Sequence, residues 1–464
     1  MEDKQKTIKP EKPGGFLDFL PAEYIARDKI IKTAKKVFSS FGFDPVETPK
    51  IEFYKTLSGE KSDTGKQIFQ IRSEKENEPL ALIFDHTVPL ARIVAENPYN
   101  TKTDKGIELP WKRMAFGPVF RGESPQSGRY CQLYQIDADI VGSSSDLADT
   151  ELIALIYKTF SKLKIENFVI KINNRKILNG LADIADIKDR ESVTKENITK
   201  EILRILDKIN KIGTEEVLKK LQEKPKKENP LAPGLSEQTI KEVKKYLSLK
   251  GDNHQLLDEC GKIFKNSGIA QEGIKELTKI IKLLKSFNVP EEFVKIDFSI
   301  ARGLDYYTGP VMETFLLDAP EFGSVASGGR YNNLLTRFTG KELPATGVSI
   351  GIDRLFAALK KLELINTKKN TLTDVMVLRL LKNRDEEYLK IADTIRKKGY
   401  NCEISLLKDT TFKNQFNFAI RKGIKYIIIC GEEEFKKGTV QIKNTKTREQ
   451  KEIKQEEIGN FFEK

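Results

Sequence analysis

Cysteine and histidine are scarce in this sequence. Its 464 residues include four cysteines and two histidines, His86 and His254. No two cysteines form a CxxC pair, so neither a zinc site nor a disulfide framework is expected, and a reducing compartment is the simplest interpretation. Two histidines also argue against a histidine-based catalytic triad and a multi-histidine metal site. We therefore expect no metal bound tightly by the protein itself.

The sequence also has no long hydrophobic run. No stretch approaches the roughly 18 apolar residues that would cross a membrane. Residues 1–13 are polar and mix Lys with Glu and Asp. They have neither the apolar segment of a secretion signal nor the Arg-rich, acid-poor composition of a transit peptide. They are predicted to form a disordered leader, and the chain is expected in the cytoplasm with no membrane partner.

Basic residues are in excess. Lys and Arg number 80 against 68 Asp and Glu, which gives a formal net charge of +12. This balance favours a polyanionic partner such as nucleic acid, although a generally lysine-rich proteome would produce it as well. At roughly 100–200 residues per domain, the length suggests two to four domains.

The first part of the chain predicts helices and β-strands in mixed order. Apolar residues recur at helical spacing over residues 22–41, and several strand-like segments follow. The last of these, residues 133–141, alternates strictly: Gln135, Asp137 and Asp139 share one face, and the opposite face is apolar. Such a polar face is either exposed to solvent or part of a wet binding site.

Two segments contain arginines suited to binding phosphate. In residues 116–130 a strand ends at Arg121, a loop of small and polar residues follows, and the chain returns through Arg129. In residues 347–355 a strand turns into a helix that has Arg354 in its first turn. An arginine at the end of a strand or at a helix N-terminus suits an anion. A surface hairpin and an ordinary Gly-rich turn remain the alternatives, because the glycines match neither P-loop nor Rossmann spacing.

A third segment, residues 301–309, places Arg302 beside a glycine and ahead of two tyrosines. Tyr306 and Tyr307 offer ring faces and hydroxyls to a ligand. A tyrosine pair half-buried in a sheet would explain the same residues.

Together these segments resemble class II aminoacyl-tRNA synthetases, and among them the histidyl-tRNA synthetase family. Residues 120–123 with the loop to Arg129 resemble the second motif of the class, and residues 347–355 resemble the third. The helix at 22–41, with residues 43–49, resembles the first motif, which builds a dimer interface.

Two further segments are more specific to the histidine enzymes and their paralogues. They are Arg-Gly-Leu-Asp-Tyr-Tyr-Thr-Gly at 302–309 and Ser-Gly-Gly-Arg-Tyr at 327–331. The resemblance extends over nearly the whole chain. It implies an α+β fold: a class II catalytic domain built on an antiparallel sheet over 14–365, with a helical insertion at about 180–295. A linker at 366–373 and a small α/β anticodon-binding domain at 374–464 would follow.

The resemblance also implies a role for individual residues. Two arginines would grip the α-phosphate during catalysis, Arg121 and Arg302. ATP would be held by Arg121, Glu123, Arg129 and Arg354, and Gln126 would approach the acceptor stem of the tRNA. The histidine pocket would consist of Asp85, Thr87, Arg121, Gln135, Asp139, Arg302, Tyr306 and Tyr307. Some family members have Glu where Asp85 stands, and the shorter acid keeps the charge.

The implied reaction joins L-histidine to tRNA-His in two steps, with ATP and Mg²⁺ as the activating pair and a homodimer as the working state. A carboxylate must attack an anionic phosphate, so fixed cations are what this chemistry needs. No side-chain base is required for activation, because the nucleophile is already ionised.

Two related classes of protein are alternatives. One is the catalytically inactive regulatory paralogue of ATP-phosphoribosyltransferase, which lacks a proper anticodon domain and usually loses residues of the 302–309 segment. The other is a synthetase-like regulator that senses uncharged tRNA, which carries a kinase for which this chain has no room. Neither would form an aminoacyl-adenylate.

Overall fold

A computed structural model describes residues 8–58, 67–73, 77–123, 128, 130–185, 187–190, 193–300 and 307–462. The chain divides into two compact units. The larger combines Met1–Leu17 with Ile30–Leu364, and the smaller combines Asp18–Lys29 with Ile365–Lys464. Residues 8–13 of the expected leader have no helix or strand and are exposed.

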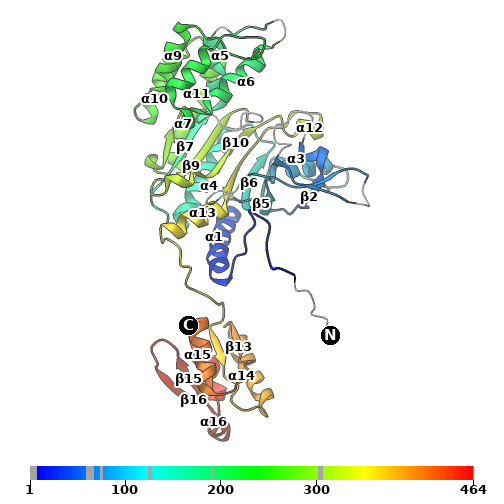
Figure 1. Cartoon of the computed structure of the whole chain (residues 1–464), viewed down its shortest axis with the longest axis vertical. Coiled ribbons are helices and arrows are strands. Elements are labelled where there is room, and N and C mark those ends of the chain that lie inside the picture. Colours follow the sequence, from blue (N-terminus) through cyan, green and yellow to red (C-terminus); the bar gives the residue numbers. More distant parts are fainter. Residues whose placement is uncertain are drawn as a thin grey trace, which may run out of the picture. The chain divides into compact units, whose positions relative to one another are not determined.

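The larger unit is built on an eight-stranded sheet, visible at the centre of Figure 1. In spatial order its strands are β1 (Asp44–Pro45), β5 (Trp111–Phe120), β6 (Gln132–Val141), β11 (Ala345–Gly351), β10 (Ser324–Tyr331), β9 (Pro310–Leu316), β7 (Phe168–Asn174) and β8 (Val294–Ile296). The pairs in its middle are antiparallel, as expected. Only the edge strands β1 and β8 pair in parallel.

Helices and a small second sheet accompany the large sheet. The helices are α1 (Pro21–Ser40), which belongs to the larger unit from Ile30 on, α2 (Tyr54–Ser58), α3 (Thr87–Glu96), α4 (Asp146–Lys162), α12 (Thr336–Thr339) and α13 (Ile352–Lys361). The small sheet has the order β2 (Ile51–Phe53), β4 (Leu80–Leu82), β3 (Gln70–Ile71). Helix α1 begins at Pro21, which suits a first helical position, and ends just before Gly42, whose φ of 80° few other residues adopt. Its apolar stripe, including Ile30, Ala34 and Phe38, is buried.

The expected helical insertion lies between β7 and β8. It contains α5 (Arg175–Ile184), α6 (Lys195–Leu206), α7 (Ile209–Ile212), α8 (Thr214–Gln222), α9 (Glu237–Leu247), α10 (Asn253–Ile263) and α11 (Gly268–Ser286). Side-chain caps start five of these helices, at Asn174, Thr194, Ser236, Asp252 and Ser267. All of the seven helices except α7 bury apolar residues, so the insertion has a core of its own.

The smaller unit has a five-stranded sheet in the order β13 (Cys402–Ile404), β12 (Val375–Val377), β14 (Tyr426–Ile429), β15 (Thr439–Asn444), β16 (Gln450–Lys454). The first three strands are parallel, and β15 and β16 form an antiparallel hairpin. Its helices are α14 (Asp385–Lys397), α15 (Phe412–Lys422), α16 (Glu432–Lys437) and α17 (Ile458–Phe461). This is the small α/β fold that the sequence predicts.

None of the helices in the described part of the chain is both long and apolar enough to cross a membrane.

Candidate active site

Arg121 follows directly after β5, where that strand ends beside the turn that leads into α3. Its Nε donates a hydrogen bond to the Phe84 carbonyl oxygen at 3.0 Å, and its backbone N–H donates to the Cys131 carbonyl oxygen at 2.8 Å. The guanidinium is thus fixed next to Asp85. A planar cation held in one orientation at a strand end is suited to a phosphate or a carboxylate.

Asp85 and Thr87 lie at the start of α3. Asp85 accepts a hydrogen bond from the backbone N–H of Val88 at 3.0 Å through Oδ1. Burial raises the pKa of Asp85 to about 6, although the Val88 N–H and the nearby Arg121 act in the opposite direction. An acid poised in this way is favoured in its ionised form when a cation arrives beside it.

The polar face of β6 is buried rather than exposed to water. Asp137 and Asp139 keep 4% and 3% of their accessible surface, so the solvent-exposed alternative is wrong. Asp139 accepts a hydrogen bond from the Tyr331 hydroxyl at 2.5 Å and forms an ion pair with Arg113 at 3.0 Å. Burial raises the pKa of Asp139 to about 6, and Arg113 opposes that rise.

Gly347 leaves the space that Asp139 occupies. It pairs with Asp139 across β6 and β11, and a Cβ at Gly347 would lie 2.0 Å from Asp139 Oδ1. The strand partner therefore needs a residue without a side chain at this position. Glycine here serves close approach and not a turn.

Two further buried residues, Arg113 on β5 and His86 before α3, lie next to these acids. Arg113 Nη2 donates to the His86 carbonyl oxygen at 2.8 Å, and His86 Nε2 lies 3.3 Å from the Gly117 carbonyl oxygen. Burial and the charges of Arg113 and Lys50 lower the pKa of His86 to about 3. The imidazole is neutral at physiological pH, so it positions the backbone and adds no charge to the site.

A cavity of about 340 Å³ opens beside this cluster. Arg121, Gln135 and Ser349 line one part of it, and Arg354 lines another. Arg354 donates a hydrogen bond from Nη1 to the Ser324 carbonyl oxygen at 2.8 Å. The two arginines thus lie on the same cavity, although they are separated by 233 positions in the sequence.

Two neighbours of Arg354 fix the cavity's shape. Asp353 Oδ2 accepts a hydrogen bond from the Tyr134 backbone N–H at 2.6 Å, which ties α13 to β6. Gly128, with φ of 71°, lies close to Phe322 and to the Cα of Arg354. Gly128 therefore lies close to the start of α13.

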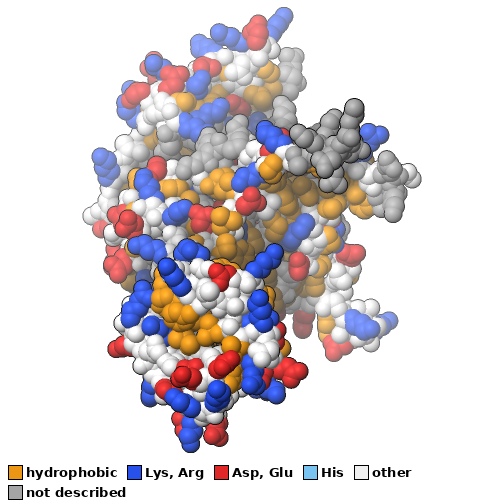
Figure 2. Space-filling model, turned by 60° about the horizontal axis from the view of Figure 1, so that its bottom comes forward, with side chains coloured by type: hydrophobic (Ala, Val, Ile, Leu, Met, Phe, Trp, Pro, Cys, Tyr) orange, Lys and Arg blue, Asp and Glu red, His pale blue; other side chains and the backbone are white. Residues whose placement is uncertain are grey.

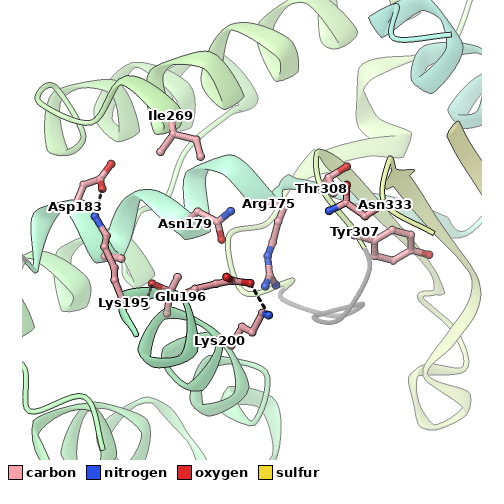
Figure 3. Close-up of a pocket in the computed structure, with 12 residues that line it drawn as sticks. Arg175, Asn179, Asp183, Lys195, Glu196, Lys200, Ile269, Tyr307, Thr308 and Asn333 are labelled. Carbon is pink, nitrogen blue, oxygen red and sulfur yellow. Dashed lines mark hydrogen bonds and ion pairs between the residues drawn. The ribbon is translucent and has the colours of Figure 1, made fainter. Parts of the chain in front are cut away.

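Tyr307 lies at a second and larger cavity, of about 580 Å³, between the sheet and the insertion (Figure 3). Its ring packs against Gly329, where a Cβ would come within 3.0 Å of it. Arg175 and Asn179 reach the same cavity from α5, and α6 contributes two ion pairs, Lys195 with Asp183 and Lys200 with Glu196. The insertion thus borders the segment before β9 that contains Tyr307.

The structure describes eight of the predicted site residues and does not describe four others. Arg121, Gln135 and Arg354 line one cavity, Asp85 and Thr87 lie near Arg121 at the start of α3, and Asp139 lies further along β6. Tyr307 lines the second cavity instead. Glu123 is described two residues after Arg121, and its backbone N–H donates to the Arg121 carbonyl oxygen at 2.8 Å. The predictions that fall outside the described residues are Gln126, Arg129, Arg302 and Tyr306.

Sequence reasoning missed several residues that position the acids. Arg113 and Tyr331 both bind Asp139, and Gly347 makes room for it. Tyr331 lies in the Ser-Gly-Gly-Arg-Tyr segment, which the resemblance singled out without giving Tyr331 a role. Nothing in the local sequence marked Arg113, because its partner Asp139 is on the neighbouring strand.

The smaller unit has a group of aromatic and basic side chains on and around α15. Phe412 and Phe416 are stacked, with ring centroids 5.4 Å apart and planes 11° apart. Arg448 lies 4.7 Å above the Phe416 ring and Lys443 lies 5.6 Å from it. Figure 2 shows this unit in front, with an apolar patch bordered by Lys and Arg side chains.

Comparisons with known proteins agree on one family. Residues 15–355 match the family model described as histidyl-tRNA synthetase, and residues 374–464 match the anticodon binding domain. A histidine–tRNA ligase of Clostridium tetani is 38% identical over 458 residues, covering 98% of each chain, and that of Wolinella succinogenes is 36% identical over 451 residues, covering 97% of this chain and 96% of the relative.

Solved structures give the same result. A histidyl-tRNA synthetase from Nostoc has a TM-score of 0.81 at 31% identity and covers 98% of this chain and all of its own. A Bacillus halodurans structure titled as an ATP phosphoribosyltransferase regulatory subunit/histidyl-tRNA synthetase has a TM-score of 0.71 at 24% identity, covering 89% of this chain and 97% of its own. At that identity the likeness shows the fold alone.

Proposed function

Because this chain belongs to the histidyl-tRNA synthetase family, we propose that it activates L-histidine with ATP and transfers it to the 3′-terminal adenosine of tRNA-His. The observation that carries the proposal is the convergence of Arg121 and Arg354 on one cavity beside the buried acids Asp85 and Asp139. Cations there suit the phosphates of ATP, and the acids suit the ammonium and imidazole of histidine.

In the activation step, a carboxylate oxygen of histidine attacks the α-phosphorus of ATP. A new P–O bond forms, the bond to the bridging oxygen of the β-phosphate breaks, and pyrophosphate leaves with that electron pair. Arg121, fixed by its hydrogen bond to Phe84, stabilises the charge that accumulates on the α-phosphate. Arg302, Glu123 and Arg129 are proposed to grip the same nucleotide, and Arg354 its terminal phosphate.

Histidine is proposed to lie over β6. Asp85 and Thr87 would receive its ammonium together with Gln135, and Asp139, oriented by Tyr331 and Arg113, would receive the imidazole. Tyr306 and Tyr307 would close the imidazole pocket. Such a buried polar site rejects apolar analogues, because its own polar groups would be left unsatisfied.

Magnesium is proposed to arrive with ATP and not to reside in the protein. The carboxylates among the described lining residues already have partners: Asp353 accepts from Tyr134, and Glu321 forms an ion pair with Lys361. Mg²⁺ commonly keeps several waters and binds through substrate phosphates. The ion would supply additional charge neutralisation on the phosphates that leave.

In the transfer step, a terminal ribose hydroxyl of the tRNA attacks the carbonyl carbon of the adenylate, and AMP leaves. Gln126 is proposed to approach the acceptor stem. The smaller unit is proposed to bind the anticodon, because α15 offers Phe412 and Phe416 for base stacking beside Arg448. Residues 374–464 contain 20 Lys and Arg against 15 Asp and Glu, which suits an RNA partner.

We further propose a cytoplasmic homodimer as the working state. The edge strand β2 exposes Ile51 and Phe53, at 45% and 40% of their accessible surface. Unpaired apolar edges are usually covered by another chain or element. All four cysteines are buried and unpaired, which suits a reducing compartment.

The test of this function is amino-acid-dependent exchange of labelled pyrophosphate into ATP, measured with each of the twenty amino acids. Exchange with histidine alone is expected, and Arg121→Ala should reduce it by roughly 100-fold or more, since loss of one charge-stabilising donor costs that much. Arg302→Ala should behave in the same way. The matched control is Arg204→Ala on α6, which should leave exchange unchanged. A folded protein that exchanges no amino acid would favour the inactive paralogue instead.

A further inference from the structure

Asp137 has no place in the roles carried over from the family, yet it lies in the middle of the proposed histidine site. It occupies the same face of β6 as Gln135 and Asp139, midway between them. The proposed function places histidine across both neighbours. A molecule that contacts Gln135 at one end and Asp139 at the other must therefore pass directly over Asp137.

The Asp137 carboxylate is buried without the contacts that buried carboxylates usually have. It is 4% exposed, and its Oδ1 has no hydrogen-bond partner. Ser349, opposite it on β11, is close enough to lower the pKa of Asp137, but the Ser349 Oγ has no full hydrogen bond either. A buried charged group without hydrogen-bond partners destabilises the fold, so its presence indicates a role in binding or catalysis.

The charges around Asp137 are unbalanced among the described residues. Arg113 and Arg121 are the cations that reach it, while Asp85 and Asp139 are two further acids in the same cluster. Three carboxylates thus face two guanidinium groups. Lys50, which lies against Gly117, also has the acid Glu47 beside it, and His86 is neutral. Among the described residues, the acids around Asp137 therefore outnumber the arginines that reach it.

We propose that Asp137 is a third acid of the amino-acid pocket, which accepts a hydrogen bond from the α-ammonium of the bound histidine and sets the pocket's affinity for that cation. The proposal rests on the proposed function and deepens it. The substrate ammonium would give Asp137 Oδ1 the hydrogen-bond donor that it lacks among the described residues. Burial raises the pKa of Asp137, although Arg113 and Ser349 oppose that rise, and an ammonium beside the acid favours its ionised form.

The test is binding of L-histidinol, which retains the ammonium and imidazole but has no carboxylate to activate. Isothermal titration of the full-length protein should show that Asp137→Asn weakens histidinol by about tenfold or more, as expected for a lost hydrogen bond to a charged group. The KM for ATP in pyrophosphate exchange should stay within about twofold. Asp258→Asn, an acid-to-amide change at an exposed position of α10 in the insertion, is the matched control and should leave both unchanged.

Two further readouts separate this role from a structural one. Because Asp137→Asn removes a buried unsatisfied charge, the thermal midpoint should rise or stay the same, whereas loss of a structural acid would lower it. At pH 6, titrations in two buffers of different ionisation enthalpy should show fewer protons released by the variant than by the wild type.

Equal histidinol affinity and equal proton release in Asp137→Asn and wild type would overturn the proposal, and so would a lower midpoint with unchanged affinity. If the variant does not fold, Ser349→Ala keeps the charge while removing its nearest hydroxyl. That variant should bind histidinol within about threefold of wild type, and a loss as large as tenfold would assign recognition to the serine instead. Failure of wild type to bind histidinol or exchange pyrophosphate would reject the proposed function itself.

Discussion

Strands β6 and β12 show two different uses of a buried sheet. In β12 both faces are apolar: Val375 and Val377 belong to one hydrophobic cluster, and Met376 belongs to another on the opposite face. In β6 the face with Ile136, Ala138 and Ile140 is equally apolar, but the opposite face buries two acids.

This difference indicates where each unit has the polar groups that could bind a ligand. Burying an acid is unfavourable unless it is paired. Asp139 is paired with Tyr331 and Arg113, and a purely apolar core such as that around β12 needs no such partners. In the smaller unit, the central strand β12 buries only apolar side chains. The aromatic and basic side chains that we propose to contact RNA are on α15 and the β15–β16 hairpin instead.

The largest expected effect comes from filling the space beside Asp139. Gly347→Ala would place a Cβ 2.0 Å from Asp139 Oδ1. Displacing this acid should reduce histidine-dependent exchange by roughly 100-fold and lower the free energy of unfolding by about 1–3 kcal/mol. Steady-state exchange and chemical denaturation measure the two effects.

Gly261→Ala on α10 is the control for that substitution. No atom lies within 4 Å of a Cβ at Gly261, so alanine should leave exchange unchanged and stabilise the helix by up to about 1 kcal/mol. Equal exchange in Gly347→Ala and wild type would show that Asp139 does not need its present position.

A smaller effect is expected from pH. Burial raises the pKa of Asp85 and that of Asp139 to about 6, so both acids gain protons as the pH falls through 6. The pocket then loses the negative charges proposed to hold the ammonium, at Asp85, and the imidazole, at Asp139. The KM for histidine should therefore rise by roughly tenfold for each such group between pH 7 and pH 5. The substrate imidazole also titrates in this range, so wild type is compared with Asp85→Asn, which should have a higher KM with a weaker pH dependence.

The same groups affect stability with a defined sign. Their pKa values are higher in the folded chain than the ordinary carboxyl value near 4, so folding favours their protonated forms. Their contribution to stability is present at pH 4 and is lost as the pH rises through about 6.

For the KM prediction, identical pH profiles in wild type and Asp85→Asn would contradict the assignment of Asp85 to the ammonium.

The smallest expected effect belongs to the smaller unit. Phe412→Ala should lower kcat/KM for tRNA by about tenfold, because a stacked base contributes about 1–3 kcal/mol, while pyrophosphate exchange stays unchanged. Leu389→Ala is the matched control: Leu389 is also exposed, at 55%, but lies on α14 of the same unit. Aminoacylation over a range of tRNA concentrations separates the two.

Much of the fold follows from local patterns in the sequence. Period-two alternation predicted β6 over residues 133–141, and the strand extends over Gln132–Val141. Helical spacing with Pro21 and Gly42 at its ends predicted α1. These elements are predictable because their signals come from neighbouring residues that share a face.

The site is less predictable because its contacts join distant segments. Tyr331 and Asp139 are 192 positions apart, and Arg330 reaches the buried Asp149 across 181. The alternation in β6 showed that its acids share a face, but it could not show that α3, β10 and β11 bury that face. Of residues 43–49, which resemble part of the first class motif, only Asp44–Pro45 form a strand, β1, which pairs with Arg113 and Met114 of β5.

The central claim is that the larger unit carries out both chemical steps whereas the smaller unit contributes tRNA binding, and one set of measurements tests it directly. Pyrophosphate exchange and tRNA charging are measured on the same preparations of wild type, Gly347→Ala and Phe412→Ala, with histidine as the amino acid. The account predicts that Gly347→Ala loses both activities, whereas Phe412→Ala keeps exchange and loses charging at low tRNA concentration. Loss of exchange in Phe412→Ala, or full charging by Gly347→Ala, would contradict it.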